Sequence, residues 1–122
     1  MSEVENITIF TDGSCSVKDE YLRGGFGVFI ITKNEEIPIR KGYWNTTTAR
    51  MEMMAILTAV QSINPKVRCK VLIVTDSQFI ANSFSEGWIK KWRMNDYKGV
   101  KNASIWRKIV YEIESRRNMH LM

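Results

Sequence analysis

The sequence has few cysteines, a single histidine and no long apolar run. Cys15 and Cys69 are its only cysteines, which argues against a disulfide-stabilised secreted protein and favours a reducing compartment. The longest apolar stretches, residues 26–31 and 71–74, fall far short of the roughly 20 residues that a membrane-spanning helix needs. Residues 1–6 are polar and acidic, unlike a signal peptide. We therefore expect a cytoplasmic protein with no membrane association.

Repeats and flexible linkers are also missing. No stretch is rich in Gly or Ser, and nothing in the 122 residues marks a domain boundary. Hydrophobic residues make up 44% of the chain and charged residues 25%, as in an ordinary globular protein. A chain of this length can bury one core. We therefore expect a single domain that spans residues 1–122.

Acidic residues are outnumbered. Eighteen Lys and Arg residues against thirteen Asp and Glu residues give a net charge of +5 and a pI near 9.4. Most of the excess lies in the C-terminal third, which contains Lys90, Lys91, Arg93, Lys98, Lys101, Arg107, Lys108, Arg116 and Arg117. Such a surface attracts polyanions, including nucleic acids. A merely solvated surface explains the same charges about as well.

Apolar periodicity predicts strands and helices in alternation. Strands are expected at residues 7–11, 24–31, 37–43, 71–75 and 119–122. Helices are expected from the threonines at 46–48 to Asn64, from the Asp76-Ser77 cap to about residue 84, over 88–93, and over 104–117. A polar loop should connect residues 94–102. Three antiparallel strands followed by two parallel ones indicate an α/β protein whose five-stranded mixed sheet is flanked by helices.

Three carboxylates occupy suggestive places in this arrangement. Asp12 and Asp76 are each expected at the end of a strand, and Glu52 in the first half of a helix. Ligands bind such sheets at the carboxyl ends of strands, so parallel neighbours would bring the two aspartates together. Carboxylates that meet repel one another unless a cation such as Mg²⁺ or Mn²⁺ holds them. For either aspartate alone, capping a turn is the simpler interpretation.

Three local sequences together favour a metal site over the simpler interpretation as turn caps. They are Thr11-Asp12-Gly13-Ser14, Arg50-Met51-Glu52 with Met54-Ala55, and Thr75-Asp76-Ser77-Gln78. In order and context they resemble the motifs around the first three catalytic carboxylates of the ribonuclease H family. The segments Gly24-Gly25-Phe26-Gly27-Val28 and Trp88-Ile89-Lys90-Lys91-Trp92 fit the same pattern, and the resemblance extends from Ile7 to Met122.

The resemblance implies a ribonuclease H-like fold and an endonuclease that hydrolyses the RNA strand of RNA–DNA hybrids. It implies two Mg²⁺ ions per site, with Mn²⁺ as a substitute. By similarity, Asp12 would bridge both ions, while Glu52 and Asp76 would hold the ion on the leaving-group side. Such a reaction needs no protein nucleophile, so Ser14, Cys15 and Ser77 are interpreted as packing or positioning residues.

The resemblance also suggests contacts to the nucleic acid. The candidates are Gln78, Thr48, Lys90, Lys91, Arg93, Lys98 and Lys101, the last five from a segment that is similar to the family's basic protrusion but shorter. Trp88, Trp92 and Trp106 are expected mainly in the core. Ala49 stands where family members carry a groove-reading asparagine, so discrimination between hybrid and duplex DNA should be weaker.

The C-terminal end departs from the family pattern. The family continues into a loop with a histidine and a last helix with a fourth aspartate, neither of which this sequence contains, and His120 is interpreted as a strand residue. We expect weaker activity or a need for Mn²⁺, and a second copy or another chain that covers the exposed sheet face. The alternatives are a nucleic-acid-binding module without catalysis and, on the same fold, an integrase or junction resolvase.

Overall fold

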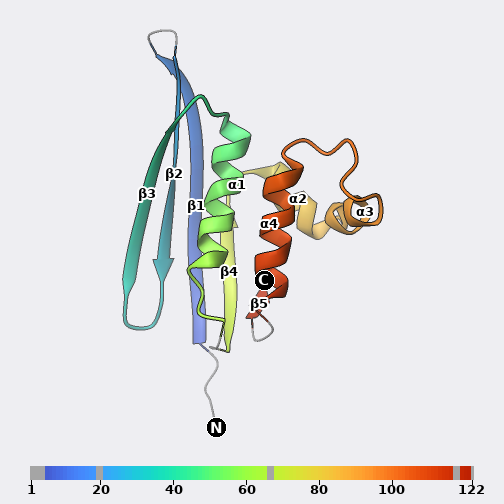
Figure 1. Cartoon of the computed structure of the whole chain (residues 1–122). Coiled ribbons are helices and arrows are strands. Elements are labelled where there is room, and N and C mark those ends of the chain that lie inside the picture. The colour runs from blue at the N-terminus through green and yellow to red at the C-terminus, as the bar shows by residue number, and fades with distance from the viewer. Residues whose placement is uncertain (1–4, 19–20, 66–67, 117–118, 122) are drawn as a thin grey trace.

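The computed structural model describes residues 5–18, 21–65, 68–116 and 119–121 (Figure 1). Along the chain, the elements are β1 (Glu5–Lys18), β2 (Tyr21–Ile31), β3 (Glu36–Trp44), α1 (Thr48–Gln61), β4 (Cys69–Thr75), α2 (Gln78–Ser85), α3 (Trp88–Met94), α4 (Ala103–Glu114) and β5 (Met119–Leu121). None of the helices within these ranges is long and apolar enough to cross a membrane.

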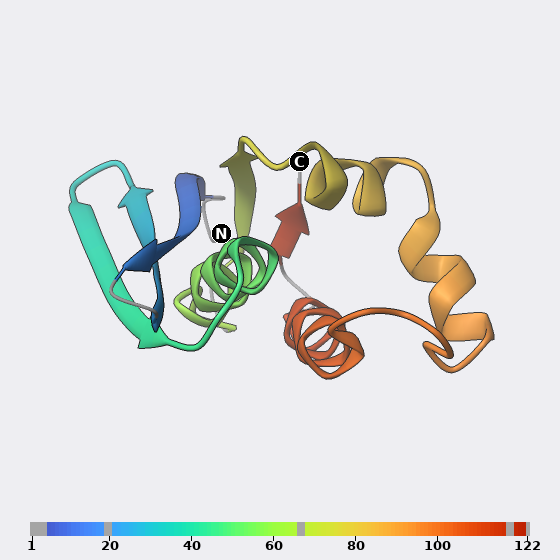
Figure 2. The same ribbon diagram turned by 90° about the horizontal axis from the view of Figure 1, so that it is seen from above.

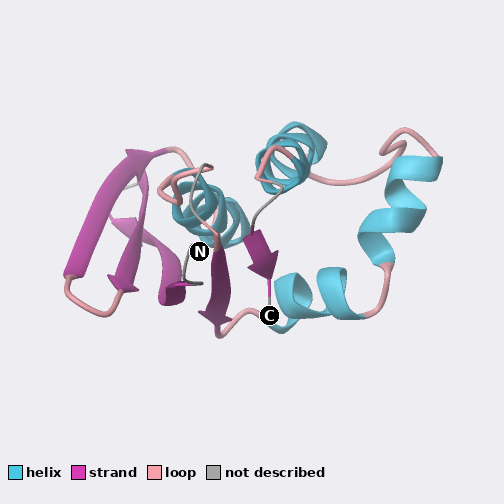
Figure 3. Ribbon diagram, turned by 90° about the horizontal axis from the view of Figure 1, so that it is seen from below, coloured by secondary structure: helices cyan, strands magenta, loops and turns pink. Residues whose placement is uncertain are grey.

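The strands form one mixed sheet in the order β3-β2-β1-β4-β5. β1 pairs antiparallel with β2, and β2 with β3, whereas β4 runs parallel to β1 and to β5. Helices α1 and α4 lie side by side on one face of this sheet (Figure 2). The other face of β1, β2 and β3 is open in the described structure (Figure 3). The predicted α/β class and mixed sheet are confirmed.

Helix α1 begins where the sequence predicts. The Thr47 side chain accepts a hydrogen bond from the backbone N–H of Arg50 at 3.2 Å, which caps the free end of the helix. The next turns bury an apolar stripe against β1 and β2, and the helix ends before Pro65. In β1, Ile7, Ile9 and Thr11 point to this helix, while residues 10 and 12 point to the open face.

The predicted end of the first strand is wrong. β1 does not end before Asp12 but continues to Lys18, because β2 begins earlier than predicted, at Tyr21, and pairs with it along this whole length. Only the pairing with β4 stops at Thr11, opposite Thr75. Asp12 therefore lies in the middle of a strand, one residue beyond the point where its parallel neighbour ends.

Two other predicted boundaries need correction. The side chain that caps α2 is Ser77 alone, which accepts a hydrogen bond from the N–H of Ile80, whereas Asp76 precedes the cap. The last helix ends at Glu114 and not at 117, because Arg116 turns back toward α1. The predicted loop at 94–102 is confirmed as a series of turns from residue 95 onward, since Met94 still belongs to α3.

The three tryptophans that were expected in the core, Trp88, Trp92 and Trp106, are buried or half-buried. Trp106 of α4 is fully buried, with Phe79 and Phe84 packed against its edges. Trp88 and Trp92 of α3 are half-buried in the same aromatic cluster. This cluster attaches the short helix α3, which buries no residue fully, to the rest of the structure.

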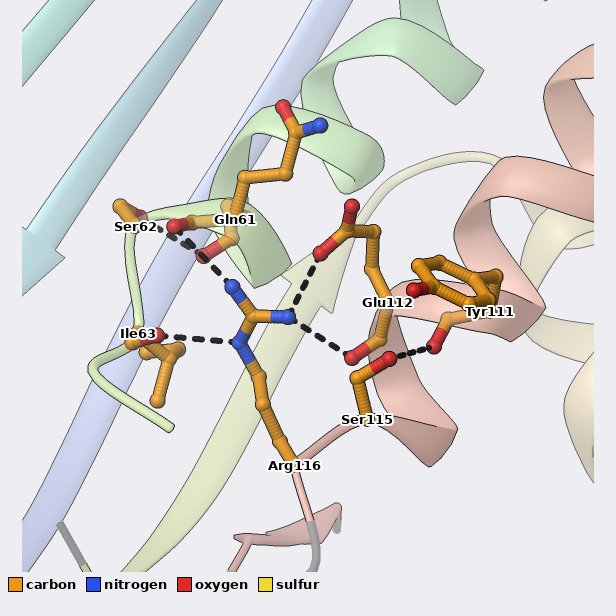
Figure 4. A network of polar contacts seen from close by, with 8 residues as sticks. Gln61, Ser62, Ile63, Tyr111, Glu112, Ser115 and Arg116 are labelled. Carbon is orange, nitrogen blue, oxygen red and sulfur yellow. Dashed lines mark hydrogen bonds and ion pairs between the residues drawn. The ribbon is translucent and has the colours of Figure 1, made fainter. Parts of the chain in front are cut away.

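Arg116 joins the C-terminal ends of α1 and α4 (Figure 4). Its side chain is only 8% exposed and donates to the carbonyl oxygens of Gln61, Ile63 and Glu112 at 3.2, 2.9 and 2.8 Å. It also forms an ion pair of 2.7 Å with the Glu112 carboxylate. The last carbonyl groups of a helix have no hydrogen-bond partner within the helix. The single guanidinium of Arg116 therefore supplies donors to carbonyl groups at the C-terminal ends of both α1 and α4.

Replacing Arg116 with alanine should lower the free energy of unfolding by about 2 kcal/mol, since it leaves several partly buried acceptors without donors. Lys108→Ala on the same helix is the matched control, because Lys108 is exposed. Urea unfolding of both variants measures the difference. Equal stability of the two would mean that the hydrogen bonds of Arg116 make no net contribution.

Candidate active site

Asp12 and Asp76 follow neighbouring parallel strands at the same end. Thr11 and Thr75 are the last pair between β1 and β4, and the Thr11 hydroxyl donates to the carbonyl of Val74 at 3.3 Å. Each aspartate comes one residue after this pair. Both residues are exposed, and neither carboxylate has a hydrogen bond or ion pair with another described residue. Their carboxylate oxygens are therefore not committed to protein partners.

Glu52 is brought to the same edge by a close approach of α1 to β1. A Cβ atom added at Gly13 would lie 2.4 Å from the backbone nitrogen of Glu52 and 2.5 Å from the carbonyl carbon of Met51. Only glycine leaves room for a helix backbone at that distance. The residue after Asp12 thus sets how near the helix that carries Glu52 can come.

The pKa of the Glu52 carboxyl group reflects its burial and the negative charges of the neighbouring aspartates. Burial raises the pKa of its carboxyl group, a hydrogen bond with the Ser77 side chain lowers it, and the negative charges of Asp76 and Asp12 raise it again. Ser77 is buried, and its hydroxyl also caps α2. Both aspartates therefore lie close enough to Glu52 to repel its carboxylate.

The three carboxylates do not close on a common point. Within the described ranges, no group of three His, Cys, Asp or Glu side chains stands in an arrangement that could hold a metal ion. Asp12 lies on the open face of the sheet, whereas Glu52 belongs to the helix on the opposite face. An all-oxygen donor set nevertheless suits hard divalent cations.

The predicted contacts Thr48 and Gln78 stand at helix beginnings near the carboxylates. Thr48 is the first residue of α1 and is exposed. Gln78 is the first residue of α2, and its amide donates to the side chain of Asn82 at 2.7 Å. Each lies within four residues of a predicted metal-binding carboxylate along the chain.

The five basic candidates differ in their surroundings. Lys90 and Lys91 are exposed on α3, whereas the guanidinium of Arg93 forms an ion pair with Glu114 of α4. Lys98 and Lys101 border a hollow of about 490 Å³ that Phe79 and Trp92 also line. A cationic, aromatic-lined hollow suits a nucleic-acid strand.

The sequence analysis did not identify Gly13 as part of the site, and it interpreted Ser77 only as a packing or positioning residue. Their signals were present, because each directly follows a predicted metal-binding aspartate in the motifs that carry the resemblance. Small residues at these positions permit the close packing that places Glu52.

Comparison with known proteins shows the family of this chain. The RNase H family model matches residues 4–122. The chain belongs to the ribonuclease H family. The curated relatives include a ribonuclease H of Chromobacterium violaceum, 35% identical over 99% of this chain and 80% of its own length. Another, from Desulforamulus reducens, is 32% identical over 89% of this chain and 69% of its own length. The chain spans 66% to 80% of the length of such relatives.

Solved structures support the same fold. The foamy viral protease-reverse transcriptase in complex with an RNA/DNA hybrid matches 95% of this chain with a TM-score of 0.74. Sequence identity is 20%, and the match covers 17% of that longer protein. The ribonuclease H-like fold that the motifs implied is therefore confirmed by similarity over nearly the whole chain.

Proposed function

We propose that this ribonuclease H family member is an endonuclease that hydrolyses the RNA strand of RNA–DNA hybrids with the help of divalent metal ions. The observation that carries the proposal is the gathering of Asp12, Glu52 and Asp76 at one edge of a ribonuclease H-like sheet. Family membership over residues 4–122 supports the same reaction. A structural relative bound to an RNA/DNA hybrid supports the substrate.

In this proposal, Asp12, Glu52 and Asp76 hold two Mg²⁺ ions, or Mn²⁺ in their place. The ions would supply an activated water and stabilise the departing oxygen, so no side chain has to act as nucleophile. Asp12 and Asp76, exposed and uncommitted, provide oxygen ligands from the two strands. Ser77 orients the Glu52 carboxylate through its hydrogen bond. The backbone contact at Gly13 fixes the distance of α1 from β1.

The same proposal assigns Thr48, Gln78 and the cationic residues after Gly87 to the substrate. Lys90, Lys91, Lys98 and Lys101 present positive charge to a phosphate backbone, and Arg93 would have to leave Glu114 to do so. We place the reaction in the cytoplasm, which the unpaired Cys15 and Cys69 favour.

The experiment is cleavage of a hybrid with a labelled RNA strand in Mg²⁺ and in Mn²⁺, beside single-stranded RNA and duplex DNA. Cleavage confined to the RNA of the hybrid supports the proposal. The alternative is a binding module that recognises the hybrid without cleaving it. Salt-dependent hybrid binding without turnover in either metal would support that alternative.

We also propose that a second copy of this chain covers the open sheet face around Phe10, Phe29 and Val74. Phe10 pairs with Phe29 on one side and Val74 on the other, and all three are at least 36% exposed. Apolar rows of this kind invite a protein partner. Sedimentation velocity of wild type and Phe10→Lys tests this. A dimer lost in the variant supports it, and a wild-type monomer rejects it in favour of another chain or no partner.

A further inference from the structure

A row of three residues crosses β1, β2 and β3 on the open face of the sheet. The antiparallel registers place Asp12 opposite Gly27, and Gly27 opposite Arg40. Residues directly opposite one another in antiparallel strands present their side chains on the same face. Ile39, the neighbour of Arg40, packs toward the core under α1, which agrees with Arg40 pointing the other way. Arg40 and Asp12 thus share a face, with only a glycine between them.

The space between these two side chains is open. A Cβ atom at Gly27 would find just one neighbouring heavy atom within 4 Å, the carbonyl oxygen of Ile39 at 4.0 Å. The adjacent row pairs Ser14 with Gly25, and Gly25 with Gly42, so two more glycines extend the floor. A hollow of about 420 Å³ lies here, and Asp12 and Arg40 are both among its lining residues. At Gly25, Gly27 and Gly42, the floor of the hollow is therefore polypeptide backbone.

The guanidinium of Arg40 has no binding partner among the described residues. It is exposed, and no hydrogen bond or ion pair connects it to another residue in the described part of the chain. Other arginines are engaged: Arg23 stacks on Trp44 at 4.5 Å, and Arg93 and Arg116 form ion pairs. A free guanidinium at the rim of a hollow can bind a phosphate through two parallel hydrogen bonds.

We propose that Arg40 and the floor of Gly25, Gly27 and Gly42 form a phosphate subsite for the strand that is cleaved. This inference rests on the proposed function, because it takes Asp12 as the position of the scissile phosphate. Two interstrand spacings of about 4.8 Å separate the Asp12 and Arg40 positions, so one sugar-phosphate backbone can contact both. The glycine floor lets that backbone lie flat against β2. Arg40 is then a substrate-binding residue, with no part in the chemistry.

The first test is hybrid binding in EDTA as a function of salt, with wild type, Arg40→Ala, Arg40→Lys and Lys33→Ala. Lys33 is an exposed residue in the turn between β2 and β3. Its replacement by alanine removes one positive charge, as Arg40→Ala does, but at a place away from the hollow. Arg40→Ala should weaken binding about 10-fold and reduce the slope of log K against log salt by about 1. Arg40→Lys should restore part of the affinity, and Lys33→Ala should resemble wild type.

The second test locates the phosphate. Hybrids with one neutral methylphosphonate at successive positions of the RNA strand are bound by wild type and by Arg40→Ala. At one position near the scissile phosphate, the neutral group should weaken wild type but not the variant, since the partner of Arg40 is already gone. Additive losses at every position, or equal binding by Arg40→Ala and Lys33→Ala, would overturn the subsite.

These outcomes separate the subsite from the proposed function. Binding in EDTA requires no cleavage, so a protein that fails to cleave hybrids in Mg²⁺ or Mn²⁺ still reports whether Arg40 contacts a phosphate. In a protein that cleaves, Arg40→Ala should raise KM and leave kcat nearly unchanged, because the contact is made equally in the ground state and the transition state. An unchanged KM would also count against the subsite.

Discussion

Replacing Asp12 with asparagine should lower the single-turnover rate of hybrid cleavage by about 1,000-fold or more. Asparagine keeps the shape of the side chain but removes the negative charge that the proposed mechanism needs between two cations. Because the Asp12 carboxylate is exposed and has no hydrogen bond with another described residue, its neutralisation should not destabilise the fold. It should instead relieve part of the repulsion with Glu52.

Glu35→Gln is the matched control for this experiment. Glu35 is exposed in the turn between β2 and β3, so the variant changes the net charge by the same amount away from the site. Its cleavage rate should equal that of wild type. Thermal unfolding of both variants checks that the fold is intact. Cleavage by pure Asp12→Asn protein at the wild-type rate would remove Asp12 from the mechanism.

The sequence predicted those parts of the fold that depend on local pattern. Helix α1 could be located because a threonine cap, an apolar stripe and a proline after its end agree. The order of Asp12, Glu52 and Asp76 was likewise evident from three short motifs. The pairing of the strands was not evident from the sequence. The length of β1 depends on how far β2 pairs with it, which is a tertiary property.

Arg116 illustrates what local sequence cannot reveal. In the sequence, Arg116 is one of several C-terminal basic residues, and these together predict only a basic surface. In the structure it is buried, because carbonyls 53 and 55 residues away in the chain become available at the end of α1. Arg40 is a similar case, since its relation to Asp12 exists only through two strand registers. Both roles depend on contacts between residues that are far apart in the sequence. The periodicity of apolar residues gives no information about such contacts.

Gly13→Ala should destabilise the protein by about 3 kcal/mol and also displace Glu52. The new methyl group would fall 2.4 Å from the backbone nitrogen of Glu52, and backbone atoms cannot move aside as a flexible side chain can. Helix α1 must therefore shift away from β1. A displacement of the order of 1 Å at a reacting group can lower the rate about 100-fold, so cleavage should fall even where the variant is fully folded.

Two variants separate these effects. Gly42→Ala adds the same methyl group where the nearest heavy atom is the carbonyl oxygen of Gly24 at 3.9 Å, so it should change stability by less than about 1 kcal/mol. Arg116→Ala lowers stability at a place away from the carboxylates and should keep its cleavage rate at temperatures where it is folded. If Gly13→Ala were as stable as Gly42→Ala in urea unfolding, or as active as Arg116→Ala when folded, the contact at Gly13 would not be what positions Glu52.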